Sequence, residues 1–130
     1  SVFLGTKHAA RAMIGLGNGG TIVNTASVAG MSGGGGPQAY SATKSGVISL
    51  TMTTAAELAE HRIRVNAVCP GVIESRWLKE HPEMIEGAMK VTPLGRPSLP
   101  EDVAEAVVYL ACDAKMMTGQ MLQMDGGRTI

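Results

Sequence analysis

The stretch that most constrains the fold runs from Thr21 to Lys44 and reads TIVNTASVAGMSGGGGPQAYSATK. A β-branched run over residues 21–23 predicts a strand, and a glycine-rich loop then leads into a segment that predicts a helix. Tyr40 and Lys44 lie four positions apart at the start of that helix. Residues at this spacing share a helix face, with Cβ atoms roughly 5–6 Å apart.

This arrangement has a chemical use. A cation held beside a phenol favours the phenolate, so we expect Lys44 to let Tyr40 exchange a proton near neutral pH. Ser27 follows the strand at its C-terminal end, where parallel α/β sheets place their ligands, and its hydroxyl can donate to a developing oxyanion. Together the three side chains suit a carbonyl that is reduced or an alcohol that is oxidised. Taken singly, each also has a structural explanation: a strand-end cap, an amphipathic residue at a helix start and a solvated charge.

Ser27 and the Tyr-Ser-Ala-Thr-Lys segment resemble the active-site signature of the short-chain dehydrogenases/reductases. The resemblance continues through RVNAVCPG at residues 64–71 and ends in TGQ at 118–120 and DGG at 125–127. It implies an NAD(P)-dependent oxidoreductase acting on a small-molecule carbonyl or alcohol. In that family pattern Tyr40 transfers the hydroxyl proton, Lys44 also holds the ribose hydroxyls of NAD or NADP, and Ser27 hydrogen-bonds the substrate oxygen.

A second segment resembles the PGxIxT motif of the same family. The resemblance implies that its backbone holds the nicotinamide carboxamide and that its last residue contacts the cofactor, where this chain has serine in place of threonine. The alternative is an ordinary turn between a strand and a helix, which we consider the weaker interpretation because the segment follows a strand at the ligand edge of the sheet. The predicted cofactor-binding residues are Tyr40, Lys44, Pro70, Gly71, Val72, Ile73 and Ser75.

The glycine-rich run GLGNGG at residues 15–20 matches G-x-G-x-x-G but stands in the wrong context. A dinucleotide fingerprint follows a strand and opens a helix, so that the pyrophosphate meets the helix N-terminus. Here the pattern predicts a helix before the glycines and a strand after them. We therefore assign residues 15–20 to a helix C-cap and a turn.

The remaining pattern predicts helices over residues 1–14 and 39–60, a strand over 64–68 and a final strand over 120–124. A capping box beginning at Ser98, with Glu101 as its second member, predicts a helix that runs to Leu110. This order implies an α/β fold with a parallel sheet and right-handed crossovers. Residues 1–130 are expected to be one partial domain, the C-terminal part of a Rossmann-like three-layer fold, with the N-terminal nucleotide-binding strands of the family absent.

Composition excludes several other functions. Eleven basic and eleven acidic residues give a formal net charge of zero, which argues against a nucleic-acid partner. No apolar run approaches the roughly 20 residues that span a bilayer, so we expect no membrane association and a cytoplasmic location. The two cysteines form no CxxC pair and no histidine stands at metal-ligand spacing, so no metal site is expected.

Self-association is the expected state of this chain. The 21–23 strand would lie at the outer edge of the sheet with unpaired backbone groups, so either another copy covers it or the sequence is a fragment of a longer protein. The alternative to an enzyme is a truncated, non-catalytic oligomerisation or scaffold module derived from one. A Tyr40→Phe substitution would discriminate between the two functions.

Overall fold

The computed structural model describes residues 1–33 and 35–130, and for Trp77 it describes the backbone alone. One residue of the predicted glycine-rich loop, Gly34, therefore lies outside the described residues. The chain forms a three-stranded parallel sheet in the order β1 (Gly20–Thr25), β2 (Ile63–Pro70) and β3 (Met121–Met124). In the register Ile22 pairs with Val65, and Ala67 pairs with Met121.

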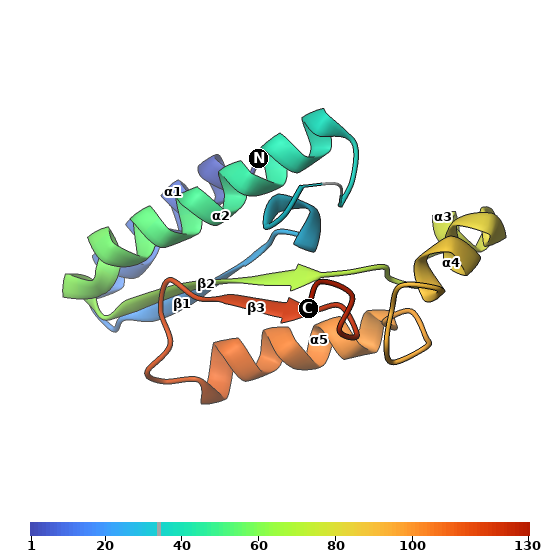
Figure 1. Ribbon diagram of the computed structural model, residues 1–130. Helices are drawn as coiled ribbons and strands as arrows, with labels where there is room; N and C mark the ends of the chain where they lie inside the picture. Colours follow the sequence, from blue (N-terminus) through green and yellow to red (C-terminus); the bar gives the residue numbers. More distant parts are fainter. Residues whose placement is uncertain (34) are drawn as a thin grey trace.

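Helices cover both faces of this sheet. The helices α1 (Val2–Leu16) and α2 (Gln38–Leu58) lie on one face, and α5 (Pro100–Val108) lies on the other (Figure 1). Two short helices, α3 (Arg76–Lys79) and α4 (Pro82–Met89), stand beyond the C-terminal ends of the strands. The predicted α/β class and the three-layer arrangement with a parallel sheet are confirmed.

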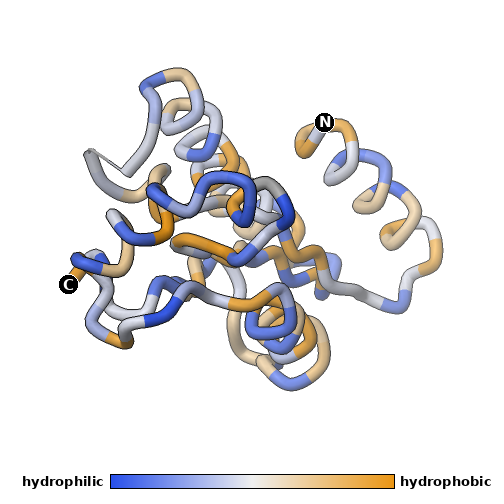
Figure 2. The backbone as a smooth tube through the Cα atoms, turned by 90° about the vertical axis from the view of Figure 1, so that its right-hand side faces the viewer, coloured by the Kyte–Doolittle hydropathy of each residue, from blue (hydrophilic) through white to orange (hydrophobic). Residues whose placement is uncertain are grey.

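The alternation of side chains along β2 explains why helices must cover both faces of the sheet. Val65, Ala67 and Cys69 are buried toward α1 and α2, whereas Val68 is buried toward α5. Side chains alternate between the two faces of a strand, so an apolar residue at each of these positions requires a helix layer on each side. Figure 2, seen from the end where α3 and α4 lie, shows apolar strand segments running between the helix layers.

The two crossovers have opposite hands, so the prediction that both are right-handed is wrong. Strands β1, β2 and β3 follow one another across the sheet in a single direction, yet α2 and α5 lie on opposite faces. The usual preference applies to a strand that feeds directly into a packed helix. Residues 71–99 instead leave the sheet through α3 and α4 before α5 begins, which relaxes that constraint.

The glycine run after α1 behaves as predicted. Gly17 adopts a left-handed conformation with φ of 70° and donates its N–H to the carbonyls of Met13 and Ile14, as a C-cap does. Gly19 also has a positive φ, and β1 begins at Gly20. Residues 15–20 thus end a helix and start a strand, and they do not open a helix for a phosphate group.

Candidate active site

Ser27 lies just beyond the C-terminal end of β1. The N–H of Ala26 donates to Val68 O at 2.9 Å, which holds this end of the strand against β2. Ser27 is the N-cap of a short 3-10 helix, Val28–Gly30, and its Oγ accepts the N–H of Ala29 at 3.2 Å. The side chain is buried and its hydroxyl hydrogen stays available to a further acceptor.

Lys44 connects the end of β1 with the start of α2. Its Nζ donates to the carbonyl of Thr25 at 3.0 Å and stands 5.7 Å from the centroid of the Tyr40 ring. Tyr40 lies in the first turn of α2, and 45% of it is exposed. The ammonium group is therefore fixed between a strand end and the aromatic ring.

Close packing keeps these two elements in place. A Cβ at Gly30 would lie 2.6 Å from the carbonyl carbon of Lys44 and 2.7 Å from the nitrogen of Ser45. The Ser45 hydroxyl donates to Gly30 O at 2.8 Å across the same contact. Glycine at this position lets the turn after Ser27 lie directly against the helix that carries Tyr40 and Lys44.

The segment from Pro70 to Ser75 leaves the neighbouring strand at the same edge of the sheet. The N–H of Gly71 donates to Met124 O at 2.9 Å. Ser98 donates its N–H to Val72 O at 2.9 Å and accepts the N–H of Glu74 at 2.8 Å, which makes a parallel bridge opposite Ile73.

The bridge decides which backbone groups remain free. In a parallel bridge the residues on either side of the central one make the hydrogen bonds, so the N–H of the central residue points away from the partner. Within the described residues the Ile73 N–H donates no hydrogen bond. An unpartnered donor at the ligand edge of the sheet fits the carbonyl oxygen of a nicotinamide carboxamide.

Ser75 also has a structural role. Its Oγ accepts the N–H of Leu78 at 3.3 Å and its carbonyl accepts the N–H of Lys79 at 3.0 Å, so it begins α3. The alternative interpretation, an ordinary turn between a strand and a helix, therefore accounts for these contacts of Ser75. The hydroxyl hydrogen of Ser75 is not used in these contacts and can donate to another group.

The sequence motifs missed one group in this region. The Thr25 carbonyl fixes Lys44, and no side-chain pattern could have indicated a main-chain acceptor. Cys69 is fully buried on β2 beside Ser27 and Lys44. Burial raises the pKa of the Cys69 thiol, although the Ser27 backbone and the Lys44 charge act in the opposite direction.

Other residues of the resembling segments stabilise the fold and lie away from this edge. Asn66 donates to Met117 O at 2.8 Å and accepts the N–H of Gln120 at 3.0 Å. The Thr118 hydroxyl accepts the N–H of Val65 at 3.1 Å. These contacts connect β2 with the chain that enters β3, so this part of the resemblance reflects architecture and not chemistry.

Comparison with known proteins identifies the family. The family model described as Enoyl-(Acyl carrier protein) reductase matches residues 1–129. The 3-oxoacyl-[acyl-carrier-protein] reductase FabG of Thermotoga maritima is 47% identical over 113 residues, covering 85% of this chain and 46% of that protein. The (3R)-3-hydroxyacyl-CoA dehydrogenase of Canis lupus familiaris is 40% identical over 128 residues, covering 97% of this chain and 49% of that protein.

Solved structures agree in fold as well as in sequence. A short-chain dehydrogenase from Leptospira borgpetersenii, determined with bound NAD+, superposes with a TM-score of 0.90 at 34% identity over 98% of this chain and 52% of that one. ElxO with NADP bound gives a TM-score of 0.87 at 32% identity over 98% and 53%. The chain belongs to the short-chain dehydrogenase/reductase family, as the resemblance predicted, and it spans about half the length of the curated relatives it matches.

The predicted cofactor class, NAD or NADP, is the one bound in these two relatives. Within the part of the chain that the structure describes, no helix is long and apolar enough to cross a membrane. The described residues also contain no group of three or more His, Cys, Asp or Glu side chains placed to hold a metal ion.

Proposed function

We propose that the protein is an NAD(P)-dependent oxidoreductase that interconverts a carbonyl and an alcohol, with Ser27, Tyr40 and Lys44 as its catalytic residues. The observation that carries the proposal is the placement of Lys44. Its Nζ is held at 3.0 Å by the Thr25 carbonyl and 5.7 Å from the centre of the Tyr40 ring, beside the strand end that presents Ser27.

Each of these residues has a distinct role. The Tyr40 hydroxyl, which makes no hydrogen bond within the described residues, gives a proton to the substrate oxygen or takes one from it. The hydroxyl hydrogen of Ser27 binds the same oxygen and orients it. Lys44 places its positive charge beside the Tyr40 ring, and its remaining N–H donors suit the hydroxyls of a ribose.

A nicotinamide cofactor would be held at the ends of β1 and β2. Tyr40, Lys44 and the Pro70–Ser75 segment are the residues proposed to hold it, with the Ile73 N–H as the donor to the carboxamide and Ser75 as a hydroxyl contact. When bound, NAD or NADP supplies or accepts the hydride. Gly71 lets this segment pack tightly on the turn after β3, because a Cβ at this position would lie 2.8 Å from the Cβ of Asp125.

Replacing Tyr40 tests the catalytic assignment. Tyr40→Phe removes the proton donor, so turnover of NADH or NADPH with a panel of carbonyl compounds is expected to fall by about 10²–10⁴-fold. The other tyrosine in the chain provides the matched control, because Tyr109 lies on the α5 side. Among the residues that the structure describes, the one hydrogen bond of its hydroxyl goes to Met117 Sδ, at 3.8 Å. Tyr109→Phe is expected to keep full activity. Equal loss in both variants, or no loss in Tyr40→Phe, would refute the assignment.

A non-catalytic oligomerisation module is the second candidate. The side chains of Phe3, Leu4 and Met52 on α1 and α2 are more than half exposed, and the outer edge of β1 pairs with no other strand among the described residues. Both features favour self-association. If Tyr40→Phe leaves every measured property unchanged while the chain assembles, this candidate is favoured.

Intact mass and cofactor titration address the assembly and domain questions together. A mass well above 13.5 kDa per chain with micromolar binding of NADH or NADPH would identify residues 1–130 as one half of a conventional reductase domain. A mass of 13.5 kDa without binding would favour the truncated module. The cytoplasmic location stays a prediction, which fractionation of the source cells would test.

A further inference from the structure

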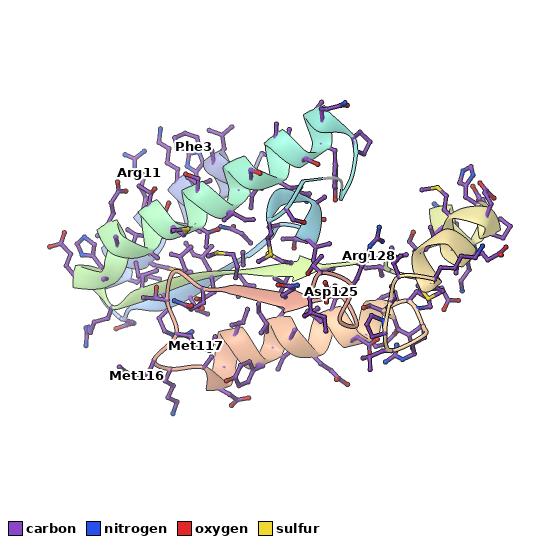
Figure 3. All side chains as sticks on the ribbon, in the orientation of Figure 1. Phe3, Arg11, Met116, Met117, Asp125 and Arg128 are labelled. Carbon is purple, nitrogen blue, oxygen red and sulfur yellow. The ribbon has the colours of Figure 1, made fainter. Side chains whose placement is uncertain are left out.

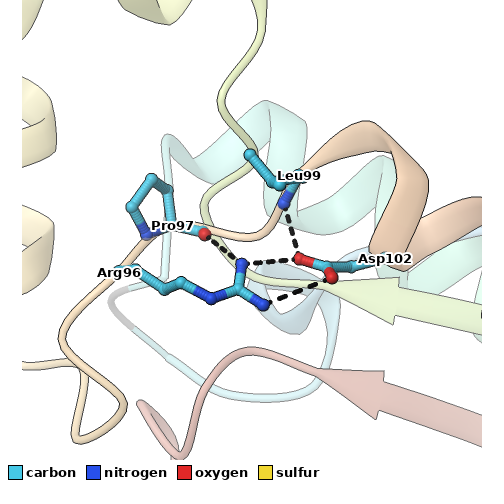
Figure 4. A network of polar contacts seen from close by, with 4 residues as sticks. All are labelled: Arg96, Pro97, Leu99 and Asp102. Carbon is cyan, nitrogen blue, oxygen red and sulfur yellow. Dashed lines mark hydrogen bonds and ion pairs between the residues drawn. The ribbon is translucent and has the colours of Figure 1, made fainter.

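One ion pair holds the chain between α4 and α5. Arg96 Nη1 lies 2.7 Å from Asp102 Oδ2, and Arg96 Nη2 lies 3.3 Å from Asp102 Oδ1, so the guanidinium and the carboxylate meet through both pairs of atoms (Figure 4). Arg96 Nη1 also donates to the carbonyl of Pro97 at 3.0 Å. Such two-point contacts restrict orientation more than a single hydrogen bond does.

The same carboxylate also begins α5. The N–H of Leu99 donates to Asp102 Oδ2 at 2.7 Å (Figure 4). Arg96 and Pro97 on one side of Ser98 and Leu99 on the other are therefore fixed to a single side chain. We call the contacts of Arg96 and Asp102 with Pro97 and Leu99 the Arg96–Asp102 bracket.

The residue inside the bracket is the one that holds the proposed cofactor segment. Ser98 donates its N–H to Val72 O and accepts the N–H of Glu74, and these bonds determine where the free N–H of Ile73 points. Residues 91–99 contain no helix or strand, so their position depends on contacts of this kind.

Residues 91–99 are loosely packed on the side that faces the end of β3. A cavity of about 180 Å³ lies between the bracket and the end of β3, and its lining includes Ser98, Asp102 and Met124. Side chains that border a cavity lack close neighbours on that side, so packing alone does not fix them. The polar contacts of the bracket supply the missing constraint.

We propose that Arg96 and Asp102 are positioning residues for the cofactor segment: the bracket fixes Ser98, and Ser98 fixes Val72–Glu74 so that the Ile73 N–H faces the nicotinamide carboxamide. The part of this proposal that concerns the cofactor rests on the proposed function. The part that concerns Ser98 and Glu74 stands on the hydrogen bonds alone.

The simpler explanation is that Asp102 only caps α5, and paired variants separate the two roles. Arg96→Ala removes the ion pair and leaves the Leu99 cap intact. Asp102→Asn removes the charge but keeps an oxygen that can accept the Leu99 N–H. Glu101→Ala is the matched control, because it removes an acidic side chain from the same helix turn outside the bracket.

Amide hydrogen exchange on the full chain measures whether the bracket holds Ser98 in place. In Arg96→Ala and Asp102→Asn the Glu74 amide, which donates to Ser98, is expected to exchange about three- to tenfold faster than in the unchanged protein. The Gly71 amide, which donates to Met124, should keep its rate. Arg96→Lys should restore part of the protection, because lysine keeps the charge but not the fork. Unchanged Glu74 exchange, or the same acceleration in Glu101→Ala, overturns the proposal.

Ligand binding tests the link to the cofactor. NADH and NADPH are titrated by fluorescence, with ADP-ribose, which lacks the nicotinamide, as the comparison ligand. Arg96→Ala is expected to raise the Kd for the better dinucleotide about three- to tenfold and to leave the Kd for ADP-ribose unchanged. Faster Glu74 exchange with an unchanged dinucleotide Kd would overturn the cofactor role. If the unchanged chain binds no dinucleotide, the proposed function fails for this chain, while Glu74 exchange still decides whether the bracket positions Ser98.

Discussion

At the scale of single residues, Asp125 shows how the turn after β3 is held. It is buried at the C-terminal end of that strand (Figure 3) and its carboxylate accepts hydrogen bonds from several donors. These are Gln123 Nε2 at 3.0 Å, the Gly127 N–H at 3.0 Å, and the N–H and hydroxyl of Thr129 at 3.0 and 2.6 Å. Burial by itself raises the pKa of Asp125, but these hydrogen bonds outweigh it and hold the pKa below its ordinary value.

The depressed pKa of Asp125 predicts a loss of stability in acid. A carboxyl whose folded pKa lies below its unfolded value of about 3.9 stabilises the fold above that pH, and the contribution disappears as the pH falls through the folded pKa. Asp125→Asn should therefore lower the free energy of unfolding at pH 7 by about 1–3 kcal/mol and make it less dependent on pH below about 4. Urea titrations at pH 7 and pH 3 measure this, and a variant with the same acid dependence as the parent would contradict it.

A second residue-scale prediction concerns Gly30, where a Cβ would strike the backbone of α2. Because the atoms it would meet belong to Lys44 and Ser45, Gly30→Ala must push the helix away from the turn after Ser27. The expected loss is about 1–3 kcal/mol of unfolding free energy. Gly46→Ala is the control on the same helix, since a Cβ there meets nothing within 4 Å, and it should stabilise the helix by about 0.5–1 kcal/mol. Similar effects of the two substitutions on urea unfolding would argue against the tight contact.

At the scale of elements, Arg64 of β2 stabilises the end of the helical segment that covers the opposite face. Its Nη1 donates to Leu110 O at 2.7 Å and Ala114 O at 3.0 Å, and its Nη2 donates to Ala111 O at 2.9 Å. These carbonyls lie in or just after the π-helical turn, Tyr109–Asp113, that follows α5, where main-chain acceptors lack partners of their own. The guanidinium thus connects the strand to the helix terminus.

Removing this connection should destabilise the protein. Arg64→Ala leaves several half-buried carbonyls without donors, so the free energy of unfolding is expected to fall by roughly 2–4 kcal/mol. Arg64→Lys should recover little of it, because an ammonium cannot reproduce the planar fork. Arg11→Ala, on the exposed side of α1, should stay within about 0.5 kcal/mol of the parent (Figure 3). Equal midpoints for Arg64→Ala and Arg11→Ala in urea unfolding would disprove the role.

Elements with local signals could be predicted from the sequence. Apolar periodicity located α1, α2 and all three strands to within a few residues, and the glycines at 15–20 indicated the end of α1. The start of α5 was misplaced by one residue. Leu99 is the N-cap in place of Ser98, because Asp102 and not Glu101 reaches back to the cap N–H. Because Glu101 and Asp102 are adjacent acidic residues, the sequence pattern alone does not show which of them accepts the N–H of the N-cap residue.

Contacts between distant parts of the chain could not be predicted. The bond from Lys44 to the Thr25 carbonyl and the bridge between Ile73 and Ser98 join segments whose spacing in sequence carries no periodic signal. The opposite hands of the crossovers likewise depend on where residues 71–99 travel, and not on any local preference. The predicted catalytic residues Ser27, Tyr40 and Lys44 converge at one sheet edge, but their roles stay a prediction until variants are measured.

At the scale of the whole molecule, the α1 and α2 layer leaves apolar surface uncovered. Phe3 and Arg11 lie on the side of these helices away from the sheet (Figure 3), and Phe3 is 60% exposed. Phe3 and Leu50 also line two adjoining hollows between the helices, of about 240 and 470 Å³. Apolar residues on more than one side of a helix indicate more than one packing partner, so we expect α2 to pack on the sheet and also on another chain.

This surface leads to a prediction about assembly. We expect sedimentation velocity to show a species larger than a 13.5 kDa monomer, and Phe3→Ser to shift it toward the monomer by removing apolar area from the contact. Val108→Ser is the matched control, because Val108 is 57% exposed on α5, in the opposite layer. A shift in the control alone would place the contact on α5. Assembly that survives both substitutions would point to the unpaired edge of β1, since backbone hydrogen bonds there do not depend on either side chain. A stable monomer in the unchanged protein would refute self-association altogether.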